Sequence, residues 1–167
     1  MKTLQFFSLL LCGLFLSPGY AQEMHPEKIK ELIVQVADTV QSNGNTLQFL
    51  YKERMLICIY DENANRMRII TPIVEREQLN EDQILNALVA NYHSALDVKY
   101  ALSDEIIWSV FTHPLKELYP HQVLDAIDQI WAAANTFGTT YSSTHLVFPG
   151  NTKKQQALPS KKIRNKT

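Results

Sequence analysis

The segments Val98–Leu102 (VKYAL) and Glu105–Phe111 (EIIWSVF) predict two short strands joined by a tight turn. Successive side chains of a strand point to opposite faces, and the second segment is apolar on both. Its two faces are Ile106, Trp108 and Val110, and Ile107, Ser109 and Phe111. Such a strand is typical of the centre of a sheet, or of a sheet whose second face is covered by a helix, a partner or a ligand.

A His113-Pro114 break follows these strands, and a long amphipathic helix is expected from about Pro120. Apolar residues recur there at helical spacing. They are Val123, Ile127, Ile130, Trp131 and Ala134. Gly138 supplies a stop after Phe137. A helix with one apolar face must pack on the sheet.

The beginning of the chain has the pattern of an export signal. Lys2 precedes an apolar run over residues 4–16, and Gly19–Ala21 has the small-x-small pattern that a signal peptidase accepts. The run is too short for a permanent membrane span. We therefore expect residues 1–21 to be a cleaved signal peptide and Gln22 to begin the mature chain.

The two cysteines are expected to differ in their fate. Cys12 lies inside the signal, in surroundings that do not form a lipoprotein junction. Cys58 would then be the single cysteine of the mature chain, unable to form an internal disulfide. Within the apolar run Leu56–Tyr60 we expect it to be a small buried hydrophobe rather than a reactive thiol.

Charge divides the rest of the chain into two parts. Residues 22–150 carry nine Lys/Arg against seventeen Asp/Glu, whereas residues 151–167 carry six basic residues and no acidic one. This predicts one acidic domain over residues 22–148 and a basic, disordered tail over residues 149–167. The tail is expected to be a solvated terminus, with contact to anionic surfaces as the alternative.

The first half of the domain predicts one helix and three strands. The helix is expected over Pro26–Ser42 with Asn43-Gly44 as its stop. Its buried stripe would be Ile29, Leu32, Ile33, Val36 and Val40. The strands are expected over Leu47–Tyr51, Met55–Asp61 and Arg66–Ile73, with Glu62–Asn65 as a hairpin connection between the last two. In the third strand Arg66 and Arg68 indicate the wetter face.

A second helix is expected from Asn80 to near Leu96, because Asn80–Gln83 has the pattern of a capping box. Its apolar face would be Ile84, Leu85, Leu88, Val89 and Tyr92. The order is then α-β-β-β-α-β-β-α. This predicts an α+β domain with a single five-stranded antiparallel sheet.

Four segments, together with this element order, resemble a known family. They are Ala95–Leu102, Ile107-Trp108, His113–Leu115 and Phe137–Tyr141. Over residues 29–141 the chain resembles the YbjN-like branch of the type III secretion chaperone-like (CesT-like) fold. The resemblance implies a small, acidic, non-enzymatic domain that dimerises and binds an extended segment of another protein. The signal peptide departs from the family pattern, because secretion chaperones act in the cytoplasm, so only the binding-domain character is carried over.

Nothing in the sequence assembles a catalytic or metal site. The five histidines (His25, His93, His113, His121 and His145) lack the i, i+4 and paired Cys/His spacings of zinc sites. No serine lies in a nucleophile elbow, and the five glycines form no phosphate-binding loop. We therefore expect no catalytic residue, no metal and no cofactor. Since His113 and His121 flank one turn, a hydrolase that uses one of them is the third-ranked hypothesis.

Aromatic and apolar strand residues suggest a recognition surface. The candidate partner-binding residues are Phe49, Tyr51, Tyr60, Ile107 and Phe111. Large amphipathic rings contribute much of the energy of protein interfaces. The alternative is that these residues belong to the core or lie beneath a helix. An exposed cluster would favour a protein partner, whereas an enclosed pocket would favour a small apolar ligand.

The function expected from these features is an exported, non-catalytic, chaperone-like domain that binds a protein or peptide segment and forms a homodimer. The alternative is a periplasmic carrier or sensor of a small apolar ligand. The signal and the resemblance together favour the periplasm, with full secretion as the alternative. We expect no nucleic-acid partner and no stable membrane span.

Overall fold

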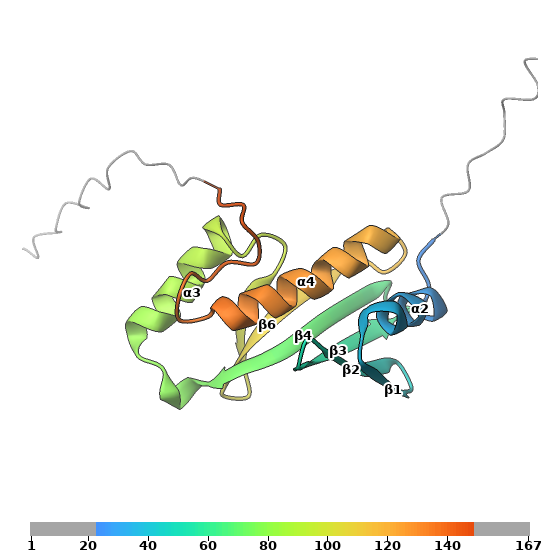
Figure 1. The fold of residues 1–167 in the computed structure, drawn as a ribbon, viewed down its shortest axis with the longest axis horizontal. Helices are drawn as coiled ribbons and strands as arrows, with labels where there is room; N and C mark the ends of the chain where they lie inside the picture. Colours follow the sequence, from blue (N-terminus) through green and yellow to red (C-terminus); the bar gives the residue numbers. More distant parts are fainter. Residues whose placement is uncertain (1–22, 149–167) are drawn as a thin grey trace, which may run out of the picture.

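The computed structural model describes residues 23–148, which form an α+β fold with one antiparallel sheet (Figure 1). The predicted signal peptide and basic tail lie outside these residues. The elements are α2 (Pro26–Val36), β1 (Thr39–Asn43), β2 (Thr46–Tyr51), β3 (Arg54–Asp61), β4 (Arg66–Glu75), the 3-10 turn η1 (Arg76–Gln78), α3 (Glu81–His93), β5 (Lys99–Ser103), β6 (Ile106–His113) and α4 (Pro120–Thr136).

The strands are arranged in the order β1-β2-β3-β4-β6-β5, and every neighbouring pair is antiparallel. Three of the hairpins turn within two residues, and in two of them both turn residues have positive φ. Lys52 and Glu53 between β2 and β3 both have positive φ, and so do Asp104 and Glu105 between β5 and β6. Paired positive φ values are the mark of a type I′ turn, whose twist matches that of the strands. The tight turn expected after VKYAL is therefore present.

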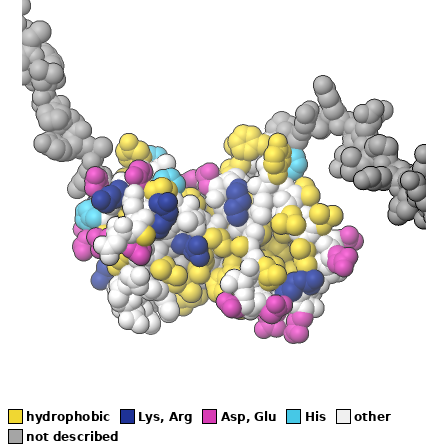
Figure 2. Space-filling model, turned by 180° about the vertical axis from the view of Figure 1, so that it is seen from behind, with side chains coloured by type: hydrophobic (Ala, Val, Ile, Leu, Met, Phe, Trp, Pro, Cys, Tyr) yellow, Lys and Arg dark blue, Asp and Glu magenta, His cyan; other side chains and the backbone are white. Residues whose placement is uncertain are grey.

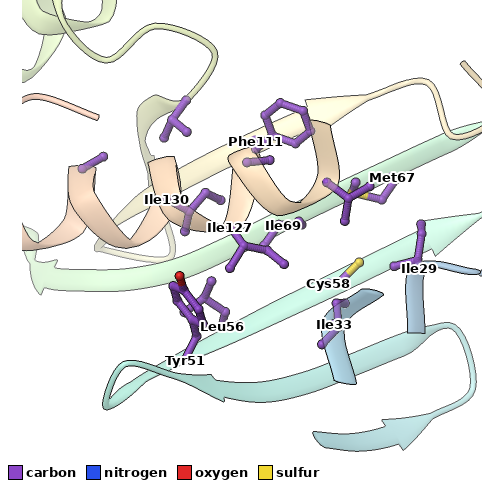
Figure 3. Close-up of a cluster of buried hydrophobic side chains, with 14 of the residues drawn as sticks. Ile29, Ile33, Tyr51, Leu56, Cys58, Met67, Ile69, Phe111, Ile127 and Ile130 are labelled. Atoms are coloured by element: carbon purple, nitrogen blue, oxygen red, sulfur yellow. The ribbon is translucent and has the colours of Figure 1, made fainter. Parts of the chain in front are cut away.

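Helices α2 and α4 cover one face of the sheet (Figure 1). α4 lies over β4 and β6, and α2 lies over β1 and β2. The core between them combines isoleucines of both helices with strand residues (Figure 3). Its members include Ile29, Ile33, Tyr51, Leu56, Cys58, Met67, Ile69, Phe111, Ile127 and Ile130. Burial of side chains of this size, each stabilising by about 1.5–3 kcal/mol, holds the layers together.

The sheet has six strands rather than the expected five, because the first helix ends earlier than its pattern indicates. α2 stops at Val36, and residues expected to be helical form β1. Val40 packs on the core as a strand residue opposite Phe49. Asn43-Gly44 is part of a hairpin turn into β2 and does not end a helix, and Gly44 there has a φ of +57°.

The α3 prediction is confirmed at its start and wrong about its buried face. Asn80 N donates to Gln83 Oε1 (3.1 Å) and Gln83 N donates to Asn80 Oδ1 (2.9 Å), which completes the capping box. Only Ala87 and Ala90 of α3 are buried. Four large apolar residues of the expected face lie outward, and Ile84 is half-buried; the four are Leu85, Leu88, Val89 and Tyr92.

α4 begins at Pro120, as expected, and Tyr119 N donates to Gln122 Oε1 (2.8 Å) at its start. The helix ends at Thr136, and Gly138 has a φ of +80°, in the left-handed region that favours glycine. Between residues 23 and 148, no helix is long and apolar enough to cross a bilayer.

Candidate partner-binding surface

Four of the five residues expected to form a recognition surface lie in or beside the core. Phe49, Tyr51, Ile107 and Phe111 are buried on the helix-covered face, with Phe49 only 1% exposed. Tyr60 is half-buried, and its hydroxyl donates to Gly44 O (3.2 Å). The alternation was predicted correctly, and for these four residues the alternative holds, in which they belong to the core or lie beneath a helix. These four side chains do not form an accessible surface on the folded chain.

The opposite face of the sheet carries the apolar side chains that reach solvent. We call this surface the open face and define it by Leu50, Met55, Ile57, Ile59, Ile70, Pro72, Trp108 and Val110. All eight are half-exposed or exposed, and Met55 reaches 47%. Seen from behind, hydrophobic side chains reach the surface across the middle of the molecule, with Lys and Arg side chains among them (Figure 2).

Strand register joins these residues into a continuous band. Ile57 lies opposite Ile70, and Ile70 lies opposite Val110, so an apolar row crosses β3, β4 and β6. Directly opposed side chains of one face lie about 4.5–5.5 Å apart at Cβ, which places these three in contact range. Trp108 is fixed in the neighbouring row, because its Nε1 donates to Ser103 O (3.1 Å). A pre-positioned indole of this kind suits a binding surface.

The sequence contained a signal for this surface in β3 as well as in β6. Met55, Ile57 and Ile59 alternate with Leu56 and Cys58, so β3 is also apolar on both faces. A strand apolar on both faces leaves one face to be covered from elsewhere.

At one end, the open face is hollowed by a depression of about 440 Å³. It is lined by Asn45, Ile59, Tyr60, Asp61, Arg66, Met67, Arg68 and Thr112. The two arginines are exposed, which agrees with the wetter face predicted for this strand. Two guanidinium groups therefore lie at the end of the band near the β3–β4 turn, with Asp61 in the same depression.

A second uncovered apolar surface lies on α3. Leu85, Leu88, Val89 and Tyr92 follow helical spacing and are all exposed, Tyr92 by 73%. The exposed residues Leu146, Val147 and Phe148 are anchored at the end of α3, where Phe148 N donates to His93 O (2.8 Å). We call these seven residues the α3 patch.

A third feature connects the β2–β3 turn to α4. Asp128 Oδ1 accepts hydrogen bonds from the Tyr51 hydroxyl (2.5 Å) and from Lys52 Nζ (2.8 Å). Burial raises the pKa of Asp128, but these hydrogen bonds outweigh it and hold the pKa below its ordinary value of 3.8. Lys52 Nζ also lies over the rings of Tyr51 and Trp131, at 4.7 and 4.9 Å from their centroids. The contacts fix the turn and offer no reactive group.

The histidines of the hydrolase hypothesis do not meet a carboxylate partner in residues 23–148. His113 shares a hollow of about 370 Å³ with Asp97 and Asp125, but its Nδ1 lies 2.8 Å from Pro114 O and its ring stacks on Phe111. His121 is exposed and stacks on Tyr119. Among the described residues, no group of three or more His, Cys, Asp or Glu side chains could hold a metal ion.

Cys58 lies on the helix-covered face of β3 and has no solvent exposure. Burial raises the pKa of its thiol to about 12, so the reactive thiolate is scarce at neutral pH. The expectation of a small buried hydrophobe is confirmed.

Comparisons with known proteins show which solved structures have a similar fold, and they assign the chain to no family. No family model and no curated protein matches the sequence. Among solved structures, the fold is similar to a chain of the HopA1–SchA chaperone–effector complex (TM-score 0.53, 9% identity, 66% of this chain and 90% of that chain). It is also similar to the Yersinia pestis type III secretion chaperone SycH in complex with a stable fragment of YscM2 (TM-score 0.52, 11% identity, 67% and 98%). The chain therefore has a secretion chaperone-like fold, as expected.

Proposed function

We propose that this protein is an exported, non-catalytic binding protein that holds a short apolar segment of another protein against its open face. One observation carries the proposal: the open face presents a continuous apolar band that neither α2 nor α4 covers. Exposed apolar areas of this kind mark interaction sites, because contact with a partner removes them from water. The similar solved structures are a chaperone–effector complex and a chaperone bound to a fragment of another protein, which supports the proposal.

The shape of the surface favours a protein segment over a small apolar ligand. A carrier site encloses most of its ligand's surface. The hollow on the open face instead borders a sheet surface, and charged side chains line it beside the apolar ones. A segment several residues long can contact both the band and the hollow, whereas a small ligand would leave most of the band in water.

Export to the periplasm is part of the same proposed function. The signal-like pattern of residues 1–21 supports export, and the resemblance to YbjN-like proteins supports the periplasm as the destination. Processing at Ala21-Gln22 would be read from the mass and the N-terminal sequence of the protein recovered from a periplasmic extract. Recovery of an unprocessed chain from the cytoplasm alone would contradict export.

We further propose that the protein is a homodimer joined through the α3 patch. The patch is apolar, and a two-fold axis would bring the same residues of two copies together. α3 contacts the edge strand β5, so a dimer made through α3 leaves the open face of each copy free.

The binding function is tested with a phage-displayed library of random peptides of about 12 residues, selected against immobilised protein of residues 22–167. Enriched peptides are synthesised with a fluorophore, and Kd is measured by anisotropy. Met55→Glu and Val110→Glu place a charge on the open face, and Thr140→Glu places the same charge on an exposed loop. We expect Kd to rise at least about tenfold for the first two and to change little for the third.

Thermal unfolding of each variant separates lost binding from lost folding. Absence of enriched peptides, or equal affinity of all three variants, would contradict the proposed function.

A further inference from the structure

Arg66 and Arg68 lie at one end of the apolar band of the open face, in an acidic domain. They point to the same side of β4, roughly 7 Å apart along the strand. Residues 22–150 carry eight more acidic than basic residues, yet two arginines line this depression with one acidic residue, Asp61, while Glu62 lies in the adjoining turn. Two guanidinium groups therefore lie next to the apolar band.

The guanidinium of Arg68 is held in place while most of its donors stay available. Its Nε donates to Thr112 Oγ1 (3.3 Å), and in the register Arg68 lies between Ile59 of β3 and Thr112 of β6. An arginine has five N–H donors, so the Nε contact leaves its two terminal nitrogens for a further partner. Within residues 23–148, no carboxylate lies within 4.0 Å of Arg68.

Arg66 and Asp61 are also engaged only in part. Arg66 Nη1 donates to Asn65 O (2.8 Å). Asp61 lies opposite Arg66 in the register, but its Oδ1 accepts from Ala64 N (2.9 Å) in the turn, and the two charged groups form no ion pair. The depression between these strands is about 440 Å³ in volume, which is ample for one acidic side chain and its neighbours.

We propose that this depression binds an aspartate or glutamate side chain of the segment held on the open face, with Arg68 as its principal partner and Arg66 beside it. The inference rests on the proposed function and adds a specificity to it: the bound segment is apolar with an acidic residue at one end. Arginine pairs with a carboxylate through two parallel hydrogen bonds, and the flanking apolar residues reduce the competition from water. The acidic residue thereby fixes the register and direction of the segment on the sheet.

The test compares peptide selections against wild-type protein and Arg68→Gln, with Lys30→Gln as a control. Lys30 is an exposed residue of α2, so this change removes the same charge away from the open face. The probes are the phage-displayed random peptides and, from them, one synthetic peptide with its aspartate and the same peptide with asparagine. We expect wild type and Lys30→Gln to enrich apolar peptides with an acidic residue, and Arg68→Gln to enrich apolar peptides without one.

Anisotropy then measures the coupling directly. The aspartate peptide should bind wild type about tenfold more tightly than the asparagine peptide, and Arg68→Gln should abolish the difference. Arg68→Lys should restore only part of it, because an ammonium lacks the planar pair of donors. Enrichment of apolar peptides with no acidic preference would overturn this inference and leave the proposed function standing. Absence of any enrichment would overturn both.

Discussion

At the scale of single residues, the contacts of Asp128 hold the β2–β3 turn on α4. The carboxylate accepts from Tyr51 and Lys52, which neighbour each other at the start of that turn. Because its pKa is lowered in the folded chain, ionised Asp128 stabilises the fold above its ordinary pKa of 3.8, and this contribution is lost as the pH falls through the lowered value. Both charged side chains remain about half-exposed, which limits the effect.

Asp128→Asn should therefore lower the free energy of unfolding at pH 7 by about 1 kcal/mol. The difference between wild type and variant should shrink as the pH falls below about 4, because there the carboxylate binds a proton in the unfolded chain before it does so in the folded chain. Urea unfolding followed by circular dichroism measures both. Glu62→Gln in the exposed β3–β4 turn is the control. A difference that stays constant from pH 7 to pH 3 would contradict a role for the ionised carboxylate.

Cys58 should resist modification while the chain is folded. A buried thiol with a raised pKa offers little thiolate to a disulfide reagent. In protein of residues 22–167 at pH 8, we expect the reaction in native buffer to be at least about 100-fold slower than in guanidinium chloride. Equal rates in the two solutions would show that β3 opens readily and that the core around Cys58 is not closed.

At the scale of elements, the starts of two helices were predicted correctly because they depend on adjacent residues alone. The capping box of Asn80 and Gln83 and the start of α4 at Pro120 need no tertiary contact, and both are confirmed. The predicted end of the first helix was wrong, because Val40 fits a helical stripe and a core-facing strand equally well. Pairing of this segment with β2 selects the strand, and a local sequence pattern does not show which strand a segment pairs with.

Gly44 tests the hairpin that replaced the end of this helix. Its φ of +57° is unfavourable for residues with a Cβ, although a Cβ built there would meet nothing within 4 Å. Gly44→Ala should therefore destabilise the protein by about 1 kcal/mol through backbone conformation alone. Gly44→Asn should cost less, because asparagine tolerates the left-handed region. If thermal unfolding shows the two variants to be equally stable, the turn does not hold this conformation.

The binding surface was harder to predict than the fold. Alternation in β6 correctly grouped Ile107 with Phe111 and Trp108 with Val110, but it is symmetric and does not say which group a helix covers. The choice is made by α4, whose contacts with β4 and β6 are long-range. The α3 face around Leu88 was expected in the core for the same reason. Helical periodicity identifies an apolar face, but it does not show whether another element packs on that face.

At the scale of the whole molecule, two apolar surfaces are left uncovered by residues 23–148, and they lie on separate elements. The open face belongs to the sheet, and the α3 patch belongs to a helix that contacts the edge strand β5. Self-association through one and segment binding through the other are therefore compatible. A dimer would present two open faces, and a partner with two segments would then bind with increased avidity.

Light scattering coupled to size exclusion tests the dimer. Protein of residues 22–167 should have twice the mass of one chain, and Leu88→Glu should reduce this to one chain, because it places two charges in a symmetric apolar contact. Thr140→Glu should remain a dimer. A wild-type protein that is monomeric at every concentration would contradict the proposed dimer contact through the α3 patch. Segment binding to the open face would then be a property of the single chain.

An NMR titration of isotope-labelled protein with a peptide from the selection shows which surface of the protein binds the segment. If the open face is the binding surface, the largest shift changes should fall on β3, β4 and β6, at Ile57, Ile70 and Val110 and at the indole of Trp108. The signals of Leu88 and its neighbours on α3 should barely move. Shift changes confined to α3, or spread evenly over the chain, would show that the open face is not the binding surface.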